Sequence, residues 1–379
     1  MTPLPRLALL CDLLEENWQS MNLVAEMLFL QLRDGFASEV RAARIDPALS
    51  RRFSRLPLLG RKRAALNADI LLTRLWDYPR LVRRRAGDFD LLHVCDHSYA
   101  HLVHELPAAR TGVYCHDLHA FRCLFEPDHE PRPRWFRSVQ RHVLDGLKKA
   151  AVVFYSTADV RRRIDDLGLI DPDRLVHAPY GISPEYTPGP DAADAAEAAA
   201  LGLGGRPYLL HVGVCTTRKR IDVLLDVFAL ARKRYPDLRL AQIGGPWTPE
   251  QCEQIDRLGV AADVVQVRGL ERRTIAALYR RAAMLLQPSE AEGFGLPVIE
   301  ALACGATVVA SDLPILREVG GDAAVYCPVA DVPRWAEAVV RLLDDPAAAP
   351  EPSCRLAQAR RFSWASHART VLGAYQRLL

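Results

Sequence analysis

The chain has 379 residues, which is too long for one ordinary hydrophobic core and suits two α/β domains of roughly 180 residues each. Half of the residues are hydrophobic and a quarter are charged, a balance that argues against extensive disorder, and the net charge is only +3. There is no uncharged apolar run of about 18 residues and no C-x-x-C pair among the nine cysteines, so we predict neither a membrane-spanning helix nor a disulfide framework. The cytoplasm is the expected compartment.

The first half of the chain alternates short apolar segments with longer amphipathic ones. This alternation is typical of a parallel sheet with crossover helices, and it predicts one Rossmann-like lobe over residues 1–182. The expected strands are residues 7–12, 38–43, 89–94, 111–115, 151–155 and 174–177, and the expected helices are 19–33, 61–85, 136–149 and 157–167.

A stretch rich in proline, alanine and glycine follows and predicts a linker over residues 183–206. The alternation then restarts and predicts a second lobe over residues 207–355, while an amphipathic segment at the end predicts closing helices over 356–379. The expected strands of this lobe are residues 208–212, 238–243, 263–267, 284–287 and 306–310, and the expected helices are 220–234, 248–258, 271–282 and 297–303. Ligands of such sheets bind just after the strands.

The segment from Glu292 to Glu300 carries the strongest chemical pattern. Gly293 and Gly295 allow the backbone to approach a ligand closely, and Pro297 suits the first turn of a helix, whose free N–H groups form an anion site. The carboxylate of Glu300 can accept hydrogen bonds from two vicinal hydroxyls, as a ribose offers, and Glu292 can face a sugar ring. The alternative is a capped helix whose glycines only turn the chain.

Arg218 and Lys219 follow the first strand of the second lobe and precede a helix. Cations at this point can stabilise a leaving diphosphate as its negative charge develops. An exposed helix start is the alternative, but positive charge there opposes the helix dipole, which favours a function.

In the first lobe, His116 and Asp117 directly follow the expected strand 111–115. A histidine in this position can hydrogen-bond a sugar hydroxyl or a phosphate oxygen, and a neighbouring aspartate can fix its tautomer. Asp96 and His97 also lie just past a strand, within a stretch of four histidines over residues 93–104. That stretch suggests a metal site as an alternative, but we predict none because cations and helix N-termini can carry the phosphate charge.

The Glu-x7-Glu spacing, the Gly-Phe-Gly-Leu-Pro core and the following residues 301–311 resemble the signature of family 4 glycosyltransferases. The resemblance extends over residues 211–225, 242–246 and 267–270. It implies the α/β GT-B fold, in which two Rossmann-like parallel-sheet lobes face each other across a cleft and a C-terminal helix returns to the N-terminal lobe. It also implies a retaining hexosyltransferase that needs no metal or other cofactor, with a nucleoside diphosphate sugar as donor and a glycan, lipid-linked or small-molecule acceptor.

The resemblance also implies roles for individual residues. Catalytic roles fall to His116, Glu292, Arg218 and Lys219. Donor binding falls to Gly213, Arg218, Lys219, Gly244, Leu270, Gly293, Phe294, Gly295, Leu296 and Glu300. The acceptor side is assigned to Asn17, Ser20, Asp96, His97 and Asp117. Two departures stand out: Val214 occupies a position where the family often has arginine, and the first loop, residues 14–22, lacks the family's usual glycines.

Two other functions fit the same sequence. One is another sugar-nucleotide enzyme on this fold, such as an epimerase or a glycan phosphorylase, because fold does not fix reaction. The other is a non-catalytic, glycosyltransferase-like protein that binds a glycan or a partner. A dinucleotide oxidoreductase is disfavoured because no G-x-G-x-x-G follows the first strand of either lobe.

The N-terminal half concentrates its basic residues at 51–52, 61–63 and 83–85. These runs predict either a solvated helix face or a patch that meets an anionic membrane or an acidic acceptor. Nucleic acid is not an expected partner because no aromatic residues are interleaved with the charges.

Overall fold

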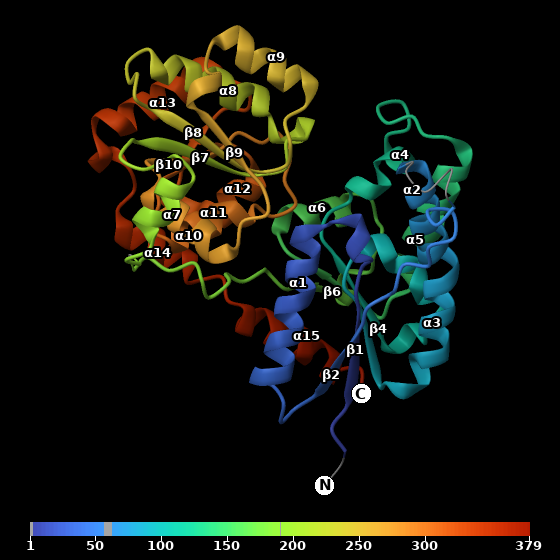
Figure 1. Ribbon diagram of the computed structural model, residues 1–379. Coiled ribbons are helices and arrows are strands. Elements are labelled where there is room, and N and C mark those ends of the chain that lie inside the picture. Colours follow the sequence, from blue (N-terminus) through green and yellow to red (C-terminus); the bar gives the residue numbers. More distant parts are fainter. Residues whose placement is uncertain (1–2, 57–62, 190) are drawn as a thin grey trace. The chain divides into compact units, whose positions relative to one another are not determined.

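The computed structural model describes residues 3–56, 63–189 and 191–379, which form two compact units (Figure 1). Unit 1 runs to Gly181 and takes in the C-terminal segment Trp364–Leu379, while unit 2 spans Ile182–Ser363. Among the described residues, no helix is long and apolar enough to cross a membrane.

Unit 1 is built on a six-stranded parallel sheet with the order β2-β1-β3-β4-β5-β6. Its four central strands are short, mostly buried apolar segments whose side chains pack on both faces, as a sheet covered by helices requires, and its two edge strands are partly exposed. In chain order they are β1 (Arg6–Leu10), β2 (Arg41–Ile45), β3 (Leu91–Val94), β4 (Thr111–Cys115), β5 (Val152–Tyr155) and β6 (Leu175–His177). Leu10 pairs with both Ile45 and Val94, so the residues after β1, β2 and β3 emerge at one edge.

Helices cover both faces of this sheet, with α3 and α5 on one side and α1 and α15 on the other (Figure 1). Helix α5 is strongly amphipathic and buries Val143, Leu144 and Leu147 against the sheet. The helices of unit 1 are α1 (Gln19–Leu30), α2 (Arg63–Leu72), α3 (Tyr78–Arg85), α4 (Arg122–Phe125), α5 (Arg134–Lys149), α6 (Ala158–Asp166) and α15 (Trp364–Gln376). The expected helix 61–85 is thus interrupted by a π-helical turn over Thr73–Asp77, and its first two residues lie outside the described ones.

The predicted return of the C-terminal helix to the first lobe is confirmed, because α15 belongs to unit 1. The Tyr375 hydroxyl donates a hydrogen bond to Leu92 O at 3.0 Å and lies 2.9 Å from His93 Nδ1. A side chain at Gly112 would collide with the same hydroxyl, so β4 needs a glycine there. Burial lowers the pKa of His93 to about 3, which makes this contact one between neutral groups.

Unit 2 repeats the architecture with a second six-stranded parallel sheet, in the order β12-β11-β10-β7-β8-β9. Its strands are β7 (Tyr208–Gly213), β8 (Arg239–Gly244), β9 (Val264–Val267), β10 (Met284–Gln287), β11 (Val308–Ser311) and β12 (Val325–Cys327). Its helices are α7 (Asp194–Ala200), α8 (Ile221–Arg232), α9 (Pro249–Leu258), α10 (Arg272–Arg281), α11 (Leu296–Ala303), α12 (Pro314–Gly320), α13 (Val332–Asp344) and α14 (Pro352–Ala359). Local chemistry sets several boundaries: α9, for example, begins with a Thr248–Gln251 capping box and ends at Gly259 in the left-handed conformation.

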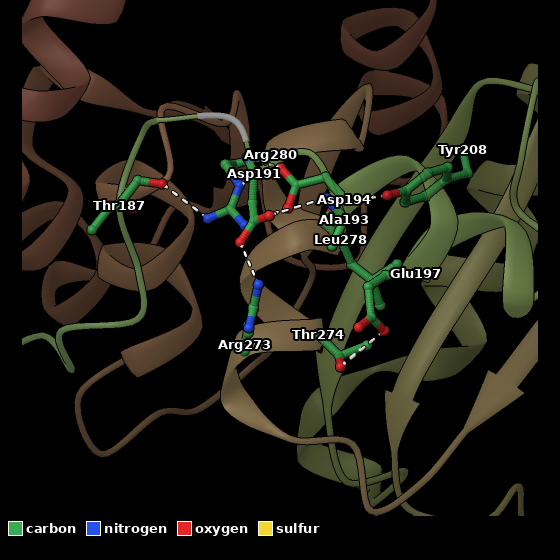
Figure 2. A network of polar contacts seen from close by, with 10 residues as sticks. All are labelled: Thr187, Asp191, Ala193, Asp194, Glu197, Tyr208, Arg273, Thr274, Leu278 and Arg280. Atoms are coloured by element: carbon green, nitrogen blue, oxygen red, sulfur yellow. Dashed lines mark hydrogen bonds and ion pairs between the residues drawn. The ribbon is translucent and has the colours of Figure 1, made fainter.

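The first part of unit 2, which includes α7, is held to the rest of that unit by a network of polar contacts (Figure 2). Arg280 of α10 forms two 2.6 Å hydrogen bonds with the Asp194 carboxylate of α7, and it also donates to Thr187 O at 3.2 Å. Both side chains of this ion pair are less than a tenth exposed. Arg273 and Asp191 form a second, solvent-exposed pair nearby.

Candidate functional site

In unit 2, the loop after β7 buries the side chain of Lys219. The turn Thr217–Lys219 ends at Arg220, which takes the left-handed conformation with φ 48°, and α8 begins at the next residue. Lys219 is 6% exposed, and its ammonium Nζ donates to Glu292 Oε1 at 2.6 Å. Burial lowers the pKa of Lys219, while the Glu292 carboxylate raises it. The turn therefore holds a buried cation at the carboxyl edge of the sheet.

Glu292 is the centre of this cluster. Its Oε1 accepts hydrogen bonds from Lys219 Nζ, from Ser289 Oγ at 2.7 Å and from Gln287 Nε2 at 2.5 Å. Its Oε2 accepts from the Arg218 guanidinium at 3.3 Å. Burial alone would raise the pKa of Glu292, but the two cations and these hydrogen bonds lower it to about 2. The structure thus brings three of the predicted catalytic residues together around an ionised carboxylate.

Gln287 and Ser289 were not predicted from the sequence. Both lie at the carboxyl end of β10, five and three residues before Glu292, so the strand-end rule that selected Glu292 could have selected them. Their donors fix one oxygen of the carboxylate and leave Oε2 with the half-exposed Arg218.

Glu300 lies in the first turns of α11, 8% exposed, where the Tyr279 hydroxyl donates to its Oε2 at 3.1 Å. Burial raises its pKa to about 7, against the opposing effect of the Tyr279 hydrogen bond. The helix begins after Gly295, whose φ of 95° is unfavourable for other residues, and a Cβ there would lie 2.8 Å from Leu316 Cδ2. Pro297 occupies the first turn, as predicted.

The other predicted donor residues lie in the loops of the same sheet edge. Gly213 and Gly244 end the neighbouring strands β7 and β8, and a side chain at Gly244 would collide with Gly213 O. Phe294 is buried and packs edge-to-face against Phe362, so its ring contributes to the core of unit 2. The remaining predicted residues, Leu270, Gly293 and Leu296, are partly exposed.

In unit 1, His116 follows β4 and is 2% exposed. Its Nε2 lies 2.8 Å from Cys95 O, and its Nδ1 is hydrogen-bonded to the Tyr180 hydroxyl. Because a carbonyl can only accept, Nε2 carries the ring proton and Nδ1 accepts from Tyr180. Burial lowers the pKa of His116 to about 4, against the raising effect of nearby Asp96. The imidazole is therefore neutral and has a partner at both nitrogens.

Three of the predicted acceptor-side residues meet beside His116. The Asp96 carboxylate caps the segment His97–Glu105 by accepting from Ser98 N at 2.6 Å. His97 Nδ1 accepts from the backbone N–H of His116 at 3.3 Å, and His97 Nε2 lies 3.8 Å from Asp117 Oδ1.

The segment after β1 holds the other two predicted acceptor-side residues, Asn17 and Ser20, and also Asp12, which was not predicted from the sequence. Asn17, in the left-handed conformation, and Ser20 are exposed, while Glu16 accepts from the Tyr99 hydroxyl at 2.7 Å. Asp12 is the second residue after β1 and is 4% exposed, and its carboxylate oxygens have no hydrogen-bond partner among the described residues. Burial and the nearby Asp96 carboxylate raise the pKa of Asp12 well above its usual value. Its position after a strand could have flagged it.

The four histidines of residues 93–104 do not converge. His93 contacts Tyr375, His101 Nε2 lies 2.9 Å from Arg74 O, and His104 Nε2 lies 3.0 Å from His142 O. Within the part of the chain that the structure describes, no group of three or more His, Cys, Asp or Glu side chains is placed to hold a metal ion.

Comparison with known proteins identifies the class. The sequence model of the family described as Glycosyl transferases group 1 matches residues 195–361. O-antigen chain mannosyltransferase B of Escherichia coli is 30% identical over 329 residues, which cover 84% of each chain. D-inositol 3-phosphate glycosyltransferase of Frankia alni is 35% identical over 243 residues, 59% of this chain and 58% of that protein.

Solved structures agree in fold. Sucrose-phosphate synthase from Thermosynechococcus elongatus superposes with a TM-score of 0.75 at 19% identity, over 99% of both chains. Anabaena HepE in complex with UDP and glucose gives a TM-score of 0.76 at 15% identity, over 98% of this chain and 100% of that one. The chain therefore belongs to the glycosyl transferases group 1 family and is a glycosyltransferase of the GT-B fold. The predicted resemblance to family 4 enzymes and the predicted pair of Rossmann-like lobes are confirmed.

Proposed function

We propose that this glycosyltransferase moves a hexose-like unit from a nucleoside diphosphate sugar to a hydroxyl of a glycan, lipid-linked or small-molecule acceptor, with retention of anomeric configuration. The cluster of Arg218, Lys219 and Glu292 carries this proposal. Glu292 stabilises the charged form of the buried Lys219, and Arg218 adds a second cation. Two preorganised cations at a strand end suit a leaving diphosphate, whose negative charge grows as the glycosidic bond breaks.

The remaining donor contacts follow from the surrounding loops. Glu300 binds the ribose hydroxyls in its ionised form, which its pKa of about 7 makes available at and above neutral pH. The glycine turns at Gly213, Gly244, Gly293 and Gly295 let the backbone approach the nucleotide sugar, and Leu270, Phe294 and Leu296 flank them.

Unit 1 supplies the groups that orient the reacting sugars. His116, whose two ring nitrogens are occupied by protein groups, holds its neighbours in place, and Asn17, Ser20, Asp96, His97 and Asp117 form the acceptor side. The two relatives named above, a mannosyltransferase and an inositol phosphate glycosyltransferase, support an acceptor with several hydroxyls.

We propose that catalysis needs no metal, because Arg218 and Lys219 provide the positive charge that a divalent cation would otherwise supply at a diphosphate. Transfer rates measured with excess EDTA and with added Mg²⁺ or Mn²⁺ should agree within about twofold. Removal of a metal ion that stabilises the transition state would change the rate far more. Loss of activity in EDTA with recovery on adding one metal would contradict this.

We propose that the protein works in the cytoplasm and contacts an anionic membrane peripherally. Trp76 is 58% exposed, Leu71 and Leu72 are also exposed, and the following helix carries Arg83 and Arg84 on its exposed face. Aromatic and basic side chains together suit the interface of an anionic bilayer. Sedimentation with phosphatidylserine vesicles should show binding at low salt that weakens at high salt. No binding at low salt would contradict the proposal. The expected basic residues Arg61 and Lys62 lie outside the described residues.

Thermal unfolding with a panel of nucleotides and sugar nucleotides tests the donor site first, since a ligand of the native state raises Tm. We expect nucleotides of one base family to raise Tm selectively. In transfer with that donor, the anomeric proton signal of the product, recorded early in the reaction by NMR, should show the same anomeric configuration as the donor. An unchanged Tm with every member of the panel would refute the donor site. Donor consumption without a glycosylated product would favour an epimerase.

A further inference from the structure

His97 and His116, two neighbouring histidines at the carboxyl edge of the unit 1 sheet, differ in whether their ring nitrogens are already hydrogen-bonded. His116 donates from Nε2 to Cys95 O and accepts at Nδ1 from the Tyr180 hydroxyl. Its ring is thus fully occupied by protein groups. His97, by contrast, has a partner at Nδ1 only, because among the described residues nothing hydrogen-bonds its Nε2.

The backbone of His116 sets the tautomer of His97. The N–H of His116 points to His97 Nδ1 at 3.3 Å, so this nitrogen must present a lone pair and the ring proton must be on Nε2. In the opposite tautomer, a proton on Nδ1 would face the Asp96 carboxylate at 3.3 Å and leave the buried N–H of His116 without that acceptor. A buried donor without an acceptor is costly, which favours the Nε2–H form.

The free Nε2–H group faces an acceptor at a distance that suits one intervening oxygen. Asp117 Oδ1 lies 3.8 Å from His97 Nε2, too far for a direct hydrogen bond. A bridging hydroxyl oxygen about 2.8 Å from each atom would accept from Nε2–H and donate to Oδ1, and because Nε2 is itself buried, that hydroxyl must enter from the exposed side of Asp117. The Asp117 carboxylate is itself oriented by the backbone N–H of His119 at 2.8 Å, and its side chain is 31% exposed, so it forms the open side of the pair.

We propose that His97 and Asp117 form a hydroxyl-binding pair for a sugar or polyol acceptor, and that His116 is a positioning residue acting through its backbone N–H. The proposal rests on the proposed function for the class of ligand, but it assigns the hydroxyl contact to His97 and not to the imidazole of His116. No covalent step is involved: one hydroxyl gains a donor and an acceptor, and a ligand without that hydroxyl leaves both protein groups unpaired.

The tautomer can be measured without any substrate. In protein labelled with ¹⁵N-histidine, the long-range ¹H–¹⁵N spectrum should show His97 protonated at Nε2 and bare at Nδ1. Methyl α-D-mannopyranoside, added as a probe, should then shift the Nε2 resonance of His97 and leave that of His116 unchanged. A His97 ring protonated at Nδ1, or an Nε2 resonance that the glycoside does not move, would overturn the assignment.

Three variants test the role in transfer to the same glycoside. His97→Phe removes the donor and should raise the acceptor KM about 10- to 100-fold, the range for a lost hydrogen bond in a buried site. His97→Gln, whose amide can donate from nearly the same place, should recover most of that loss. His104→Phe is the matched control, because His104 lies on the same segment and its Nε2 contacts His142 O.

Two comparisons separate this proposal from its alternatives. Equal losses in His97→Phe and His97→Gln, or an unchanged acceptor KM in His97→Phe, would overturn the pair. The thermal stabilisation of His97→Phe by nucleotides should match that of the wild type, because the donor contacts lie in unit 2. If nucleotides stabilise neither protein, the proposed function fails, whereas a stabilised but unaffected His97→Phe refutes only the hydroxyl-binding pair.

Discussion

The two units keep buried titratable groups in different ways. Unit 2 pairs opposite charges: Lys219 and Glu292 are both buried and in contact at 2.6 Å, and the pKa of Glu292 is lowered to about 2. In unit 1 the buried histidines are neutral, because burial lowers the pKa of His93 to about 3 and of His116 and His367 to about 4, and Asp96 is a buried ionised group beside them. A preformed charge cluster suits a charged ligand, and neutral hydrogen-bonding groups suit an uncharged one. The difference fits a diphosphate donor in unit 2 and a hydroxyl acceptor on unit 1.

The largest expected effect comes from neutralising the charge cluster. Glu292→Gln keeps the size of the side chain but removes the charge that holds Lys219 and Arg218, and we expect kcat to fall about 100- to 1000-fold. Initial rates with the donor found by thermal unfolding measure the change, and circular dichroism verifies the fold. Glu290→Gln, which alters an exposed carboxylate paired with Arg220, is the matched control. Equal rates for both variants would remove Glu292 from the mechanism.

The buried ion pair between Asp194 and Arg280, which is separate from the Glu292 cluster, tests whether ion pairing also stabilises the fold of unit 2. Asp194→Ala leaves Arg280 buried without its carboxylate and should lower the free energy of unfolding by about 3 kcal/mol. The double variant Asp194→Leu with Arg280→Met should regain most of this loss, since apolar packing can replace a buried pair.

Urea unfolding measures these differences in the free energy of unfolding. Arg273→Ala is the control, because it breaks the exposed neighbouring pair with Asp191 and should cause a much smaller loss (Figure 2). A loss in Asp194→Ala no larger than that of Arg273→Ala would show that the buried pair does not stabilise the unit.

Glu300 is an exception within unit 2, since burial raises its pKa to about 7 from the usual 4.5. Protonation is therefore favoured by folding: the stability from this group is fully present below about pH 4.5 and is lost as the pH rises through 7, a loss of about 3 kcal/mol. Glu300→Gln should abolish that loss and raise Tm relative to wild type at pH 8 but not at pH 4.5. Equal Tm differences at both pH values would show that Glu300 is not protonated in the folded protein.

The same residue predicts a pH dependence of donor binding. Because the ionised carboxylate accepts two ribose hydroxyls, donor affinity of the wild type should increase between pH 6 and pH 8. Glu300→Gln should bind more weakly at pH 8 and without that increase. Calorimetric titration with the stabilising nucleotide measures both, and a wild-type affinity independent of pH would contradict the ribose contact.

The sequence predicted most of what is local along the chain. The alternating buried strands and the positions just after them led to Glu292, Lys219 and His116, because a parallel sheet gathers its strand ends at one edge. Strand β12 and the 3₁₀ segment over residues 97–105 were missed: the strand has only three residues, and the second segment lacks the period of an α-helix.

What could not be predicted depends on contacts between distant parts of the chain. Tyr180 lies 64 residues from His116, yet it occupies the Nδ1 atom that the sequence leaves free for a ligand. Tyr375 contacts His93 across 282 residues. Periodicity carries no information on such partners, so the tautomers and pKa values of the histidines emerged only from the structure.

The smallest expected effect tests the neutral packing of unit 1 without altering a charge. Gly112→Ala places a methyl group against the Tyr375 hydroxyl and 2.9 Å from Val152 Cγ1, so α15 or β5 must shift, at a cost of about 2 kcal/mol. Gly373→Ala is the matched control on α15, since its new Cβ would meet no described atom within 4 Å apart from its chain neighbours and the backbone of its own helix, and it should stabilise by about 0.5–1 kcal/mol. Urea unfolding distinguishes the opposite signs. If Gly112→Ala is as stable as the wild type, the hydroxyl contact between α15 and the sheet is not what fixes the C-terminal helix to unit 1.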